Sequence, residues 1–167
     1  MEKSGFFNST GGDRVYDASD FASYFAKLIS NGIFYAAATN LQVTVGSGMN
    51  VIVRAGSACI NGYTYENTDN LTMELATADG IYPRVDRVVV RWSAANREIR
   101  LAVLTGMAVA TPVARALTRN NDIYELGIAD ITVPQGAVSV TSGNITDTRL
   151  NSTLCGTVNS LVTAIYE

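Results

Sequence analysis

The amino-acid sequence predicts a mainly β protein: an antiparallel, jelly-roll-like β-sandwich with one helix before it and one helix after it. Short runs of alternating apolar and polar residues follow one another closely through the middle of the chain, separated by Gly, Asn and Pro turn signals. Both flanks differ, because their apolar residues recur at the spacing of amphipathic helices. On this spacing we expect roughly seven to ten strands.

The composition agrees with one folded domain and excludes several kinds of site. The chain has 167 residues, of which 47% are apolar, so it is long enough to bury a core. Its net charge of −3 argues against a nucleic-acid partner. No run approaches the ~20 apolar residues of a membrane span. Because there is no histidine, a histidine base and a histidine metal site are excluded, and we expect no cofactor.

The two cysteines, Cys59 and Cys155, lie far apart and lack CxxC spacing, so we expect no metal site. Cys59 falls in an apolar strand pattern and is interpreted as a small buried hydrophobe rather than a nucleophile. The redox state of the pair, including a disulfide, is left open. The N-terminus lacks the apolar stretch of a signal peptide, and we expect synthesis in a cytoplasm.

Residues 1–16 are rich in Gly and Ser but contain Phe6, Phe7 and Tyr16, with a Gly11-Gly12 turn signal. We interpret this segment as a docking arm, which packs either on its own domain or on a partner. A helix then begins at Asp17, where Asp17 and Asp20 are expected to cap its N-terminus rather than to bind a metal.

The apolar residues of this helix form a stripe, and Asn31-Gly32 is expected to end it. Short strands follow, and Asn61-Gly62 is the strongest two-residue hairpin signal among them. The stripe consists of Phe21, Phe25 and Ile29, with Tyr24 and Leu28 beside them. The expected strands before residue 80 cover 41–45, 51–54, 57–60, 63–66 and 71–76.

Residues 84–104 predict a β-hairpin at the centre of the fold, with a polar break at 93–96. Arginines of its first strand are expected to meet Glu98 across the strand pair. One parity of each strand is apolar and predicts the core face. The expected core residues are Val88, Val90, Trp92, Ile99, Leu101 and Val103.

The chain after this hairpin predicts a crossing segment at 106–119, with one helical turn at 113–118. A strand is expected at 123–133, where Gly127 marks a bulge, and a last short strand begins at Val138 and Val140. The polar neighbours Asp86 with Arg87, and Asp147 with Arg149, are interpreted as ion-pair positions that fix loop geometry.

The C-terminal residues 151–167 predict a helix, because four apolar residues are spaced by four, three and four positions, as in a heptad seam. This helix either packs on its own sheet or begins a helical oligomer stem. With the arm at 1–16 and the domain at 17–150, it completes three expected units. The seam consists of Leu154, Val158, Leu161 and Ile165.

No catalytic signature is present, so the candidate sites are contact surfaces. Phe6 and Phe7 join the C-terminal seam as interface candidates. Tyr63 and Tyr65 are candidates for stacking on a sugar ring, with a core or interface role as the more ordinary interpretation. Paired carboxylates such as Asp79 and Asp86 could serve a glycosidase, but no pair stands out from the turns and strands around it.

Several motifs in order along the chain resemble tail and baseplate proteins of bacteriophages and prophages from Gram-positive bacteria. The motifs are SGFFNS at 4–9, GDRVY at 12–16, DFASYF at 20–25, GSACINGY at 56–63, PRVDRVVVR at 83–91, YEL at 124–126 with ADI at 129–131, and ITDTRL at 145–150. Together they span almost the whole chain. The likeness is to the N-terminal, baseplate-proximal module of upper baseplate or receptor-binding proteins.

The resemblance implies a virion component without enzymatic activity, which attaches the host-recognition apparatus to the tail. It implies partners among other tail or baseplate proteins and a symmetric homo-oligomer, for which we favour a trimer. The alternative is a carbohydrate-binding β-sandwich, a receptor-binding protein that contacts a host cell-wall glycan directly.

Overall fold

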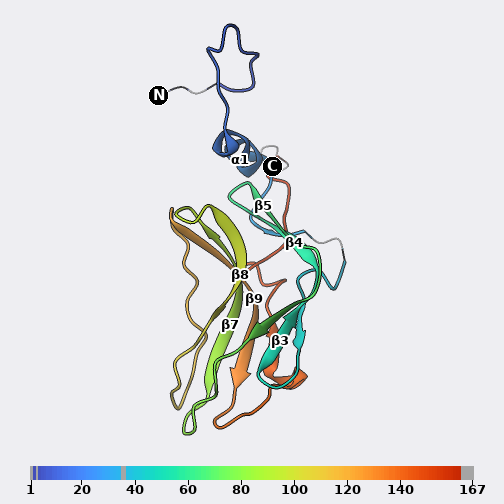
Figure 1. The fold of residues 1–167 in the computed structure, drawn as a ribbon, viewed down its shortest axis with the longest axis vertical. Helices are drawn as coiled ribbons and strands as arrows, with labels where there is room; N and C mark the ends of the chain where they lie inside the picture. The colour runs from blue at the N-terminus through green and yellow to red at the C-terminus, as the bar shows by residue number, and fades with distance from the viewer. Residues whose placement is uncertain (1, 3, 35–36, 163–167) are drawn as a thin grey trace.

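The computed structural model describes residues 2, 4–34 and 37–162 of the chain. Within them the protein is mainly β, as predicted, with ten strands in three antiparallel sheets, the helix α1 and a 3-10 turn. Figure 1 shows the strands gathered in one body, with α1 and the N-terminal segment at one end of it. A mainly β fold is therefore confirmed.

The largest sheet has the strand order β10-β9-β7-β8. The predicted central hairpin is confirmed, because β7 (Arg84–Ser93) pairs with β8 (Glu98–Leu104). On its other edge β7 pairs with β9 (Ile123–Val133), which pairs in turn with β10 (Ile145–Asp147). The pairing register shifts where Val88 faces Ala129 and Val89 faces Gly127, so the bulge expected at Gly127 is present.

Two smaller sheets hold the remaining strands. One has the order β1-β4-β5, formed by β1 (Gly32–Ile33), β4 (Gly56–Ile60) and β5 (Tyr63–Asn67). The other has the order β2-β3-β6, formed by β2 (Val43–Val45), β3 (Asn50–Val53) and β6 (Leu71–Glu74). The Asn61-Gly62 hairpin joins β4 to β5, and both residues have positive φ, as a type I′ turn requires.

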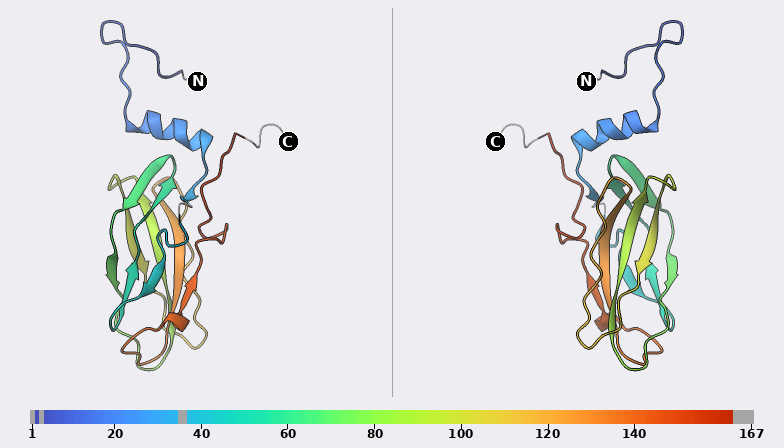
Figure 2. Two further views of the ribbon diagram at one scale, coloured as in Figure 1. Left: turned by 90° about the vertical axis from the view of Figure 1, so that its right-hand side faces the viewer. Right: turned by 90° about the vertical axis from the view of Figure 1, so that its left-hand side faces the viewer.

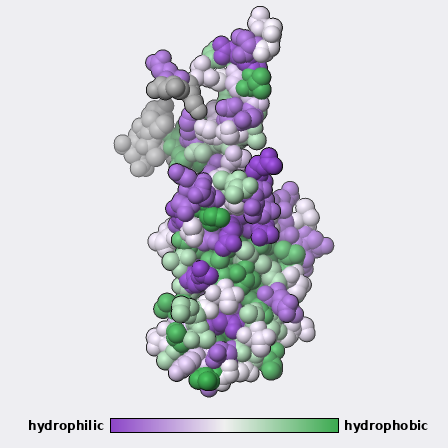
Figure 3. All heavy atoms as spheres, turned by 60° about the vertical axis from the view of Figure 1, so that its left-hand side comes forward, coloured by the Kyte–Doolittle hydropathy of each residue, from purple (hydrophilic) through white to green (hydrophobic). Residues whose placement is uncertain are grey.

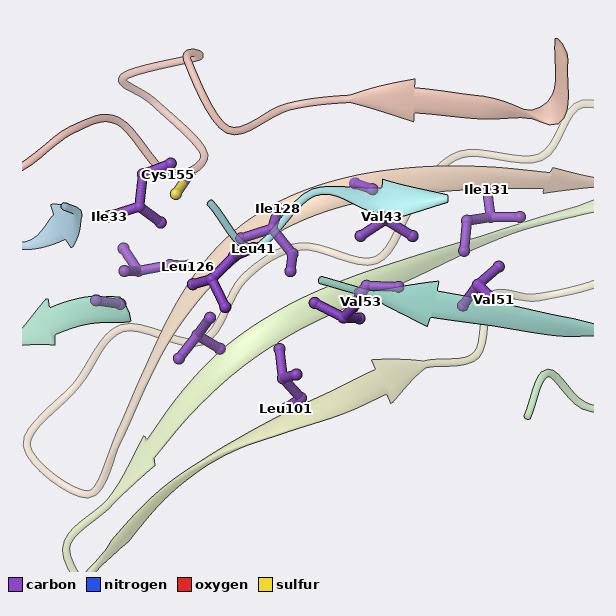
Figure 4. Packing of buried hydrophobic residues seen from close by; sticks show 14 of the residues in the cluster. Ile33, Leu41, Val43, Val51, Val53, Leu101, Leu126, Ile128, Ile131 and Cys155 are labelled. Carbon is purple, nitrogen blue, oxygen red and sulfur yellow. The ribbon is translucent and has the colours of Figure 1, made fainter. Parts of the chain in front are cut away.

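One hydrophobic core joins the three sheets (Figure 4). Ile33 and Ile60 reach it from one small sheet, Val51 and Val53 from the other, and Leu126 from the large sheet. Of the six core residues predicted in the central hairpin, three are buried and three are half-buried against the core. The buried three are Val88, Val90 and Leu101, and the half-buried three are Trp92, Ile99 and Val103.

The second face of β7 is also covered, which simple alternation did not predict. Val89, on that face, is 0% exposed, and the Arg87 guanidinium beside it is buried. The crossing segment 106–119 lies over this face, since the carbonyl of Arg115 accepts a hydrogen bond from Arg87 and that of Thr118 accepts one from the Glu125 amide. Because its backbone groups bond to the sheet, this segment does not form the helical turn expected at 113–118.

The helix α1 (Ala18–Leu28) begins as predicted, with a reciprocal capping box between Asp17 and Asp20. It ends earlier than predicted, with Ile29 as its C-cap, because Gly32 belongs to β1 and pairs with Cys59. Asn31 instead exchanges hydrogen bonds with Asn61 in the β4–β5 turn.

The described part of the C-terminal segment is not helical, so the predicted helix at 151–167 is wrong over residues 151–162. After a turn, Gly156 takes a left-handed backbone conformation with φ of +80°, and the chain runs on in extended form beside β1. The Ile33 amide donates to the Gly156 carbonyl, and the Val158 amide donates to the Ile33 carbonyl. These long-range bonds replace the intrahelical ones, and the heptad seam does not form. Ile165 lies outside the described residues.

The strand expected at Val138 and Val140 is also absent, because Val138 is 84% exposed in a loop. Val140 is buried, and its amide donates to the Gly48 carbonyl. The chain then makes a 3-10 turn (Ser142–Asn144) and pairs with β9 only from Ile145 onward.

Candidate functional site

A cavity of about 660 Å³ lies where the N-terminus of α1 faces β5 and the β7–β8 turn. Its aromatic residues are Tyr63 and Trp92, and its charged residues are Asp17, Arg97 and Glu98. In Figure 3 hydrophilic residues gather in the part of the domain next to α1, while hydrophobic residues are scattered toward the opposite end. The cavity thus combines apolar rings with a polar rim.

Strand pairing fixes the position of Trp92. It lies near the end of β7, directly opposite Tyr124 on β9 and Ile99 on β8. The Tyr63 ring, at the start of β5, lies with its centroid 6.0 Å from that of Trp92 and is tilted by 33° to it. Both residues are half-buried, so their rings are held by the sheet and still reach the cavity.

A second hollow of about 440 Å³ adjoins the first, and Trp92 lines both. Tyr124 and Arg119 form part of its wall, with the Arg119 guanidinium carbon 5.3 Å from the centre of the Tyr124 ring. Arg119 is held in place because it donates hydrogen bonds to the backbone carbonyls of Glu125 and Leu154. The other lining residues of this hollow are the amides Asn61, Asn120 and Asn121.

The charged groups of the first cavity differ in how firmly they are held. Asp17 accepts hydrogen bonds from the Ser19 hydroxyl and from the Ser19 and Asp20 amides, which lower the pKa of its carboxyl group. Glu98 accepts a hydrogen bond from Asn96, and its carboxylate oxygen lies 3.5 Å from Arg100 Nε on its own strand. The prediction that Glu98 pairs with an arginine of β7 is therefore wrong. The Arg97 side chain is exposed, and within the described residues it makes no hydrogen bond or ion pair.

The two tyrosine candidates have different positions. Tyr63 lines the cavity, whereas Tyr65 pairs with Ala58 and packs against the core. Burial raises the pKa of the Tyr65 phenol. The sequence assigned Trp92 to the core and gave no role to Tyr124. The cross-strand pairing of Trp92 with Tyr124, and the contact of the Trp92 ring with Tyr63, could not be read from local pattern.

The arm candidates lie at the α1 end of the molecule. The Phe6 ring contacts the rings of Tyr16, Phe21 and Tyr24 with centroids 5.2–5.7 Å apart, so the arm packs on its own helix. Phe7 is 60% exposed, and the Arg14 guanidinium lies over its ring.

The C-terminal candidates lie on a segment that runs toward the same end of the molecule. Leu154 and Val158 are half-buried, and Leu161 is exposed where its amide donates to the Leu28 carbonyl. Figure 2 shows this extended segment rising beside the end of α1. Phe6, Phe7 and Leu161 are therefore brought to one region, although not through the seam that the sequence predicted.

Ion pairs on the sheet serve the fold rather than a site. Asp86 pairs with Arg84 and not with its neighbour Arg87, which forms two hydrogen bonds to Asp130 across the β7–β9 pair. Arg149 pairs with Asp147 as expected and also donates to the carbonyls of Ala38 and Asn40. The Arg149 guanidinium lowers the pKa of the Asp147 carboxyl.

Both cysteine thiols are buried. Burial raises the pKa of the Cys155 thiol to about 12, and Cys59 is also a free, buried thiol. Among residues 2, 4–34 and 37–162, no cluster of three acidic or cysteine side chains could hold a metal ion. In the same residues no helix is long and apolar enough to cross a membrane.

Comparison with known proteins gives no relative from which a role for these surfaces could be inferred. No family model, curated protein or solved structure matches the chain. The two surfaces that the geometry offers are the aromatic end around α1 and the cavity around Trp92.

Proposed function

We propose that this protein is a structural, non-enzymatic component of a bacteriophage tail tip or baseplate, which attaches the host-recognition apparatus to the tail. The proposal rests on the order of motifs along the chain and on one observation, the half-exposed apolar face of α1, which Phe6 of the arm covers only in part. It includes a β-sandwich architecture, supported by two small sheets that share one core with the large sheet. Its place of action is the assembled virion.

The apolar face of α1 points away from the body of the protein. Phe21, Tyr24 and Phe25 are 49%, 47% and 46% exposed, and Ala22 is the buried residue of the helix. Ala22 faces the β4–β5 turn, where its carbonyl lies close to Gly62. An amphipathic helix of a globular protein normally turns its apolar stripe to the core, and exposed apolar patches of this kind mark interaction sites.

The occupant that this face fits best is α1 of further copies of the chain. Phe21, Tyr24 and Leu28 are spaced by three and four residues, which is the spacing of a helix–helix seam. An 11-residue helix is too short to hold such a seam alone, so neighbouring surfaces have to contribute. Phe6 of the arm and Leu161 of the C-terminal segment lie at the same end and extend the patch. We propose a cyclic homo-oligomer, with a trimer favoured, that has α1 near its axis.

The end of the domain away from α1 supplies a second apolar surface. Ile81, Met107 and Val138 are each more than two-thirds exposed, at 69%, 75% and 84%. A hydrogen bond from the Gly136 amide to the Asp79 carbonyl brings two of these loops together. Figures 1 and 2 show the loops at the pole opposite the helix. Apolar groups at both poles suit a module held between other tail proteins.

The test is to locate the protein in phage particles. A strain that encodes this chain is treated to induce its prophages, and released particles are separated from free protein by density-gradient centrifugation. We expect the protein in the particle fraction by mass spectrometry and at the tail tip by immunogold labelling. Its presence only in the free-protein fraction of a culture that releases intact tails would contradict the proposal.

The second candidate function is direct binding of a host surface carbohydrate. The cavity with Tyr63 and Trp92 is the specific observation in its favour. The two functions are compatible, because the aromatic pole and the cavity use different residues.

A further inference from the structure

We propose that the two hollows that meet at Trp92 form a single binding site for a neutral oligosaccharide. The site takes hexose or N-acetylhexosamine units, and Tyr63, Trp92 and Tyr124 are its stacking residues. This inference deepens the second candidate function and does not rest on the role in tail assembly.

The size of the site fits such a ligand. Hollows of about 660 and 440 Å³ each fall within the roughly 300–1,000 Å³ of small-molecule sites. Because Trp92 lines both, a chain of a few sugar units that stacks on its ring would reach from the α1 side to the Asn120 side.

Three aromatic side chains form a row across the end of the fold. Trp92 faces Tyr124 in the β7–β9 register, and Tyr63 flanks Trp92 from the β5 strand. Rings on paired strands have few rotamers to lose on binding, so they act as rigid apolar platforms. The C–H face of a pyranose is the flat apolar surface that matches such a platform.

The polar groups around the row match the hydroxyls of a sugar. Asn61, Asn120 and Asn121 line one hollow. The Oδ1 atoms of Asn61 and Asn120 already accept hydrogen bonds within the protein, so these two residues offer their NH2 groups as donors, while Asn121 offers both a donor and an acceptor. Arg97 and Glu98 line the other, and the Arg97 side chain makes no hydrogen bond or ion pair among the described residues. Its donors are thus available to a ligand.

Charge balance favours a neutral ligand over a polyanion. The two hollows together are lined by the carboxylates of Asp17 and Glu98 and by the guanidinium groups of Arg97 and Arg119, so their charges cancel. A nucleic-acid strand would use similar rings but needs a positive groove. The same rings with balanced charge point to a polyol.

The chain contains one tryptophan, and it lies in the site, so its fluorescence reports on binding directly. The purified protein is screened on an array of neutral and N-acetylated bacterial oligosaccharides, and each soluble hit is titrated while Trp92 emission is recorded. We expect a saturable change in emission for at least one probe. No binding on the array and no saturable change with any probe would overturn the proposal.

Two variants assign the binding to this site. Tyr63→Ala removes one ring, and Arg97→Asn removes the free cation while tolerating the positive φ of 53° at that position. Each should weaken binding about tenfold. Tyr82→Ala removes an exposed tyrosine at the opposite pole as the matched control and should leave the affinity unchanged.

Thermal unfolding of each variant shows whether it folds. If Tyr63→Ala does not fold, the affinity of Arg97→Asn alone decides whether the sugar binds at this site. Unchanged affinity in the folded variants would place the sugar elsewhere and overturn the proposal. So would tighter binding of a single-stranded oligonucleotide than of any saccharide. Tail assembly is read separately by particle fractionation, so either proposal can fail alone.

Discussion

Removal of the Asp86 carboxylate should destabilise the fold more than any single change at the surface. Asp86 is 0% exposed and accepts hydrogen bonds from Arg84 Nε at 2.9 and 3.1 Å and from the Gly106 amide at 2.8 Å. Asp86→Ala therefore leaves the buried Arg84 guanidinium without its counter-charge and the Gly106 N–H without its acceptor. Breaking a buried ion pair in this way costs about 3–5 kcal/mol. Arg84 keeps its bonds to the carbonyls of Ala76 and Thr77, so we expect about 3 kcal/mol, the lower end of that range.

Urea unfolding followed by far-ultraviolet circular dichroism measures this loss as a shift in the midpoint at constant slope. Asp122→Ala, which removes an exposed carboxylate without a side-chain bond among the described residues, is the matched control and should change stability by less than about 0.5 kcal/mol. The double variant Arg84→Met with Asp86→Leu should recover part of the loss, because no charge is left buried although the Gly106 amide still lacks its acceptor. A cost below about 1 kcal/mol for Asp86→Ala would refute the argument that this pair is buried and structural.

Two further substitutions and one labelling experiment test the packing. Leu101→Ala should lower the free energy of unfolding by about 2–5 kcal/mol in the same urea assay, whereas a change within about 0.5 kcal/mol would mean that the parity of β8 is wrong. Gly62→Ala should cost about 1–2 kcal/mol from its positive φ alone and should also speed hydrogen exchange in α1, because the new Cβ would lie 1.9 Å from the Ala22 carbonyl oxygen; unchanged exchange would contradict that contact. Cys59 and Cys155 should resist iodoacetamide at pH 8 in the folded protein and react in urea, since both are buried and the Cys155 thiol has a pKa of about 12; rapid labelling of the native protein, read by intact mass, would show that they are accessible.

Local signals in the sequence predicted the elements that local forces determine. The capping box at Asp17, the Asn61-Gly62 turn and the bulge at Gly127 each depend on the conformational preference or hydrogen bonding of a few residues in a row. The β7–β8 hairpin also has a short turn, so its register follows from adjacent sequence. These predictions are confirmed.

Errors arose where distant parts of the chain decide the structure. The spacing of Leu154, Val158 and Leu161 is helical, but the backbone there bonds to residues 28–33, a contact between positions more than a hundred residues apart. Likewise the alternation in β7 predicted that one face of the strand is exposed to solvent, but the crossing segment covers that face and buries Val89. No window of local sequence contains either contact.

The candidate site also combines a residue that the sequence could identify with residues that only long-range strand pairing brings together. Tyr63 was predicted, together with Tyr65, as a candidate for stacking on a sugar ring. Trp92 and Tyr124 lie 32 positions apart in the chain, and only the β7–β9 register brings them together. The binding surface therefore follows from strand pairing, and it could be predicted from sequence only once that pairing was known.

The aromatic end around α1 is the proposed assembly surface, and light scattering tests this role most directly. The wild-type protein at tens of micromolar should have the mass of an oligomer, with a trimer of the 17.8 kDa chain favoured. Replacing Phe21 and Phe25 together by Ser should reduce it to a monomer whose β domain still unfolds cooperatively, because these side chains are about half exposed in the single chain. The matched control Ile81→Ser with Tyr82→Ser, at the opposite pole, should leave the mass unchanged. A wild-type protein that remains a monomer at this concentration, or a Phe21 and Phe25 variant with undiminished mass, would contradict the account.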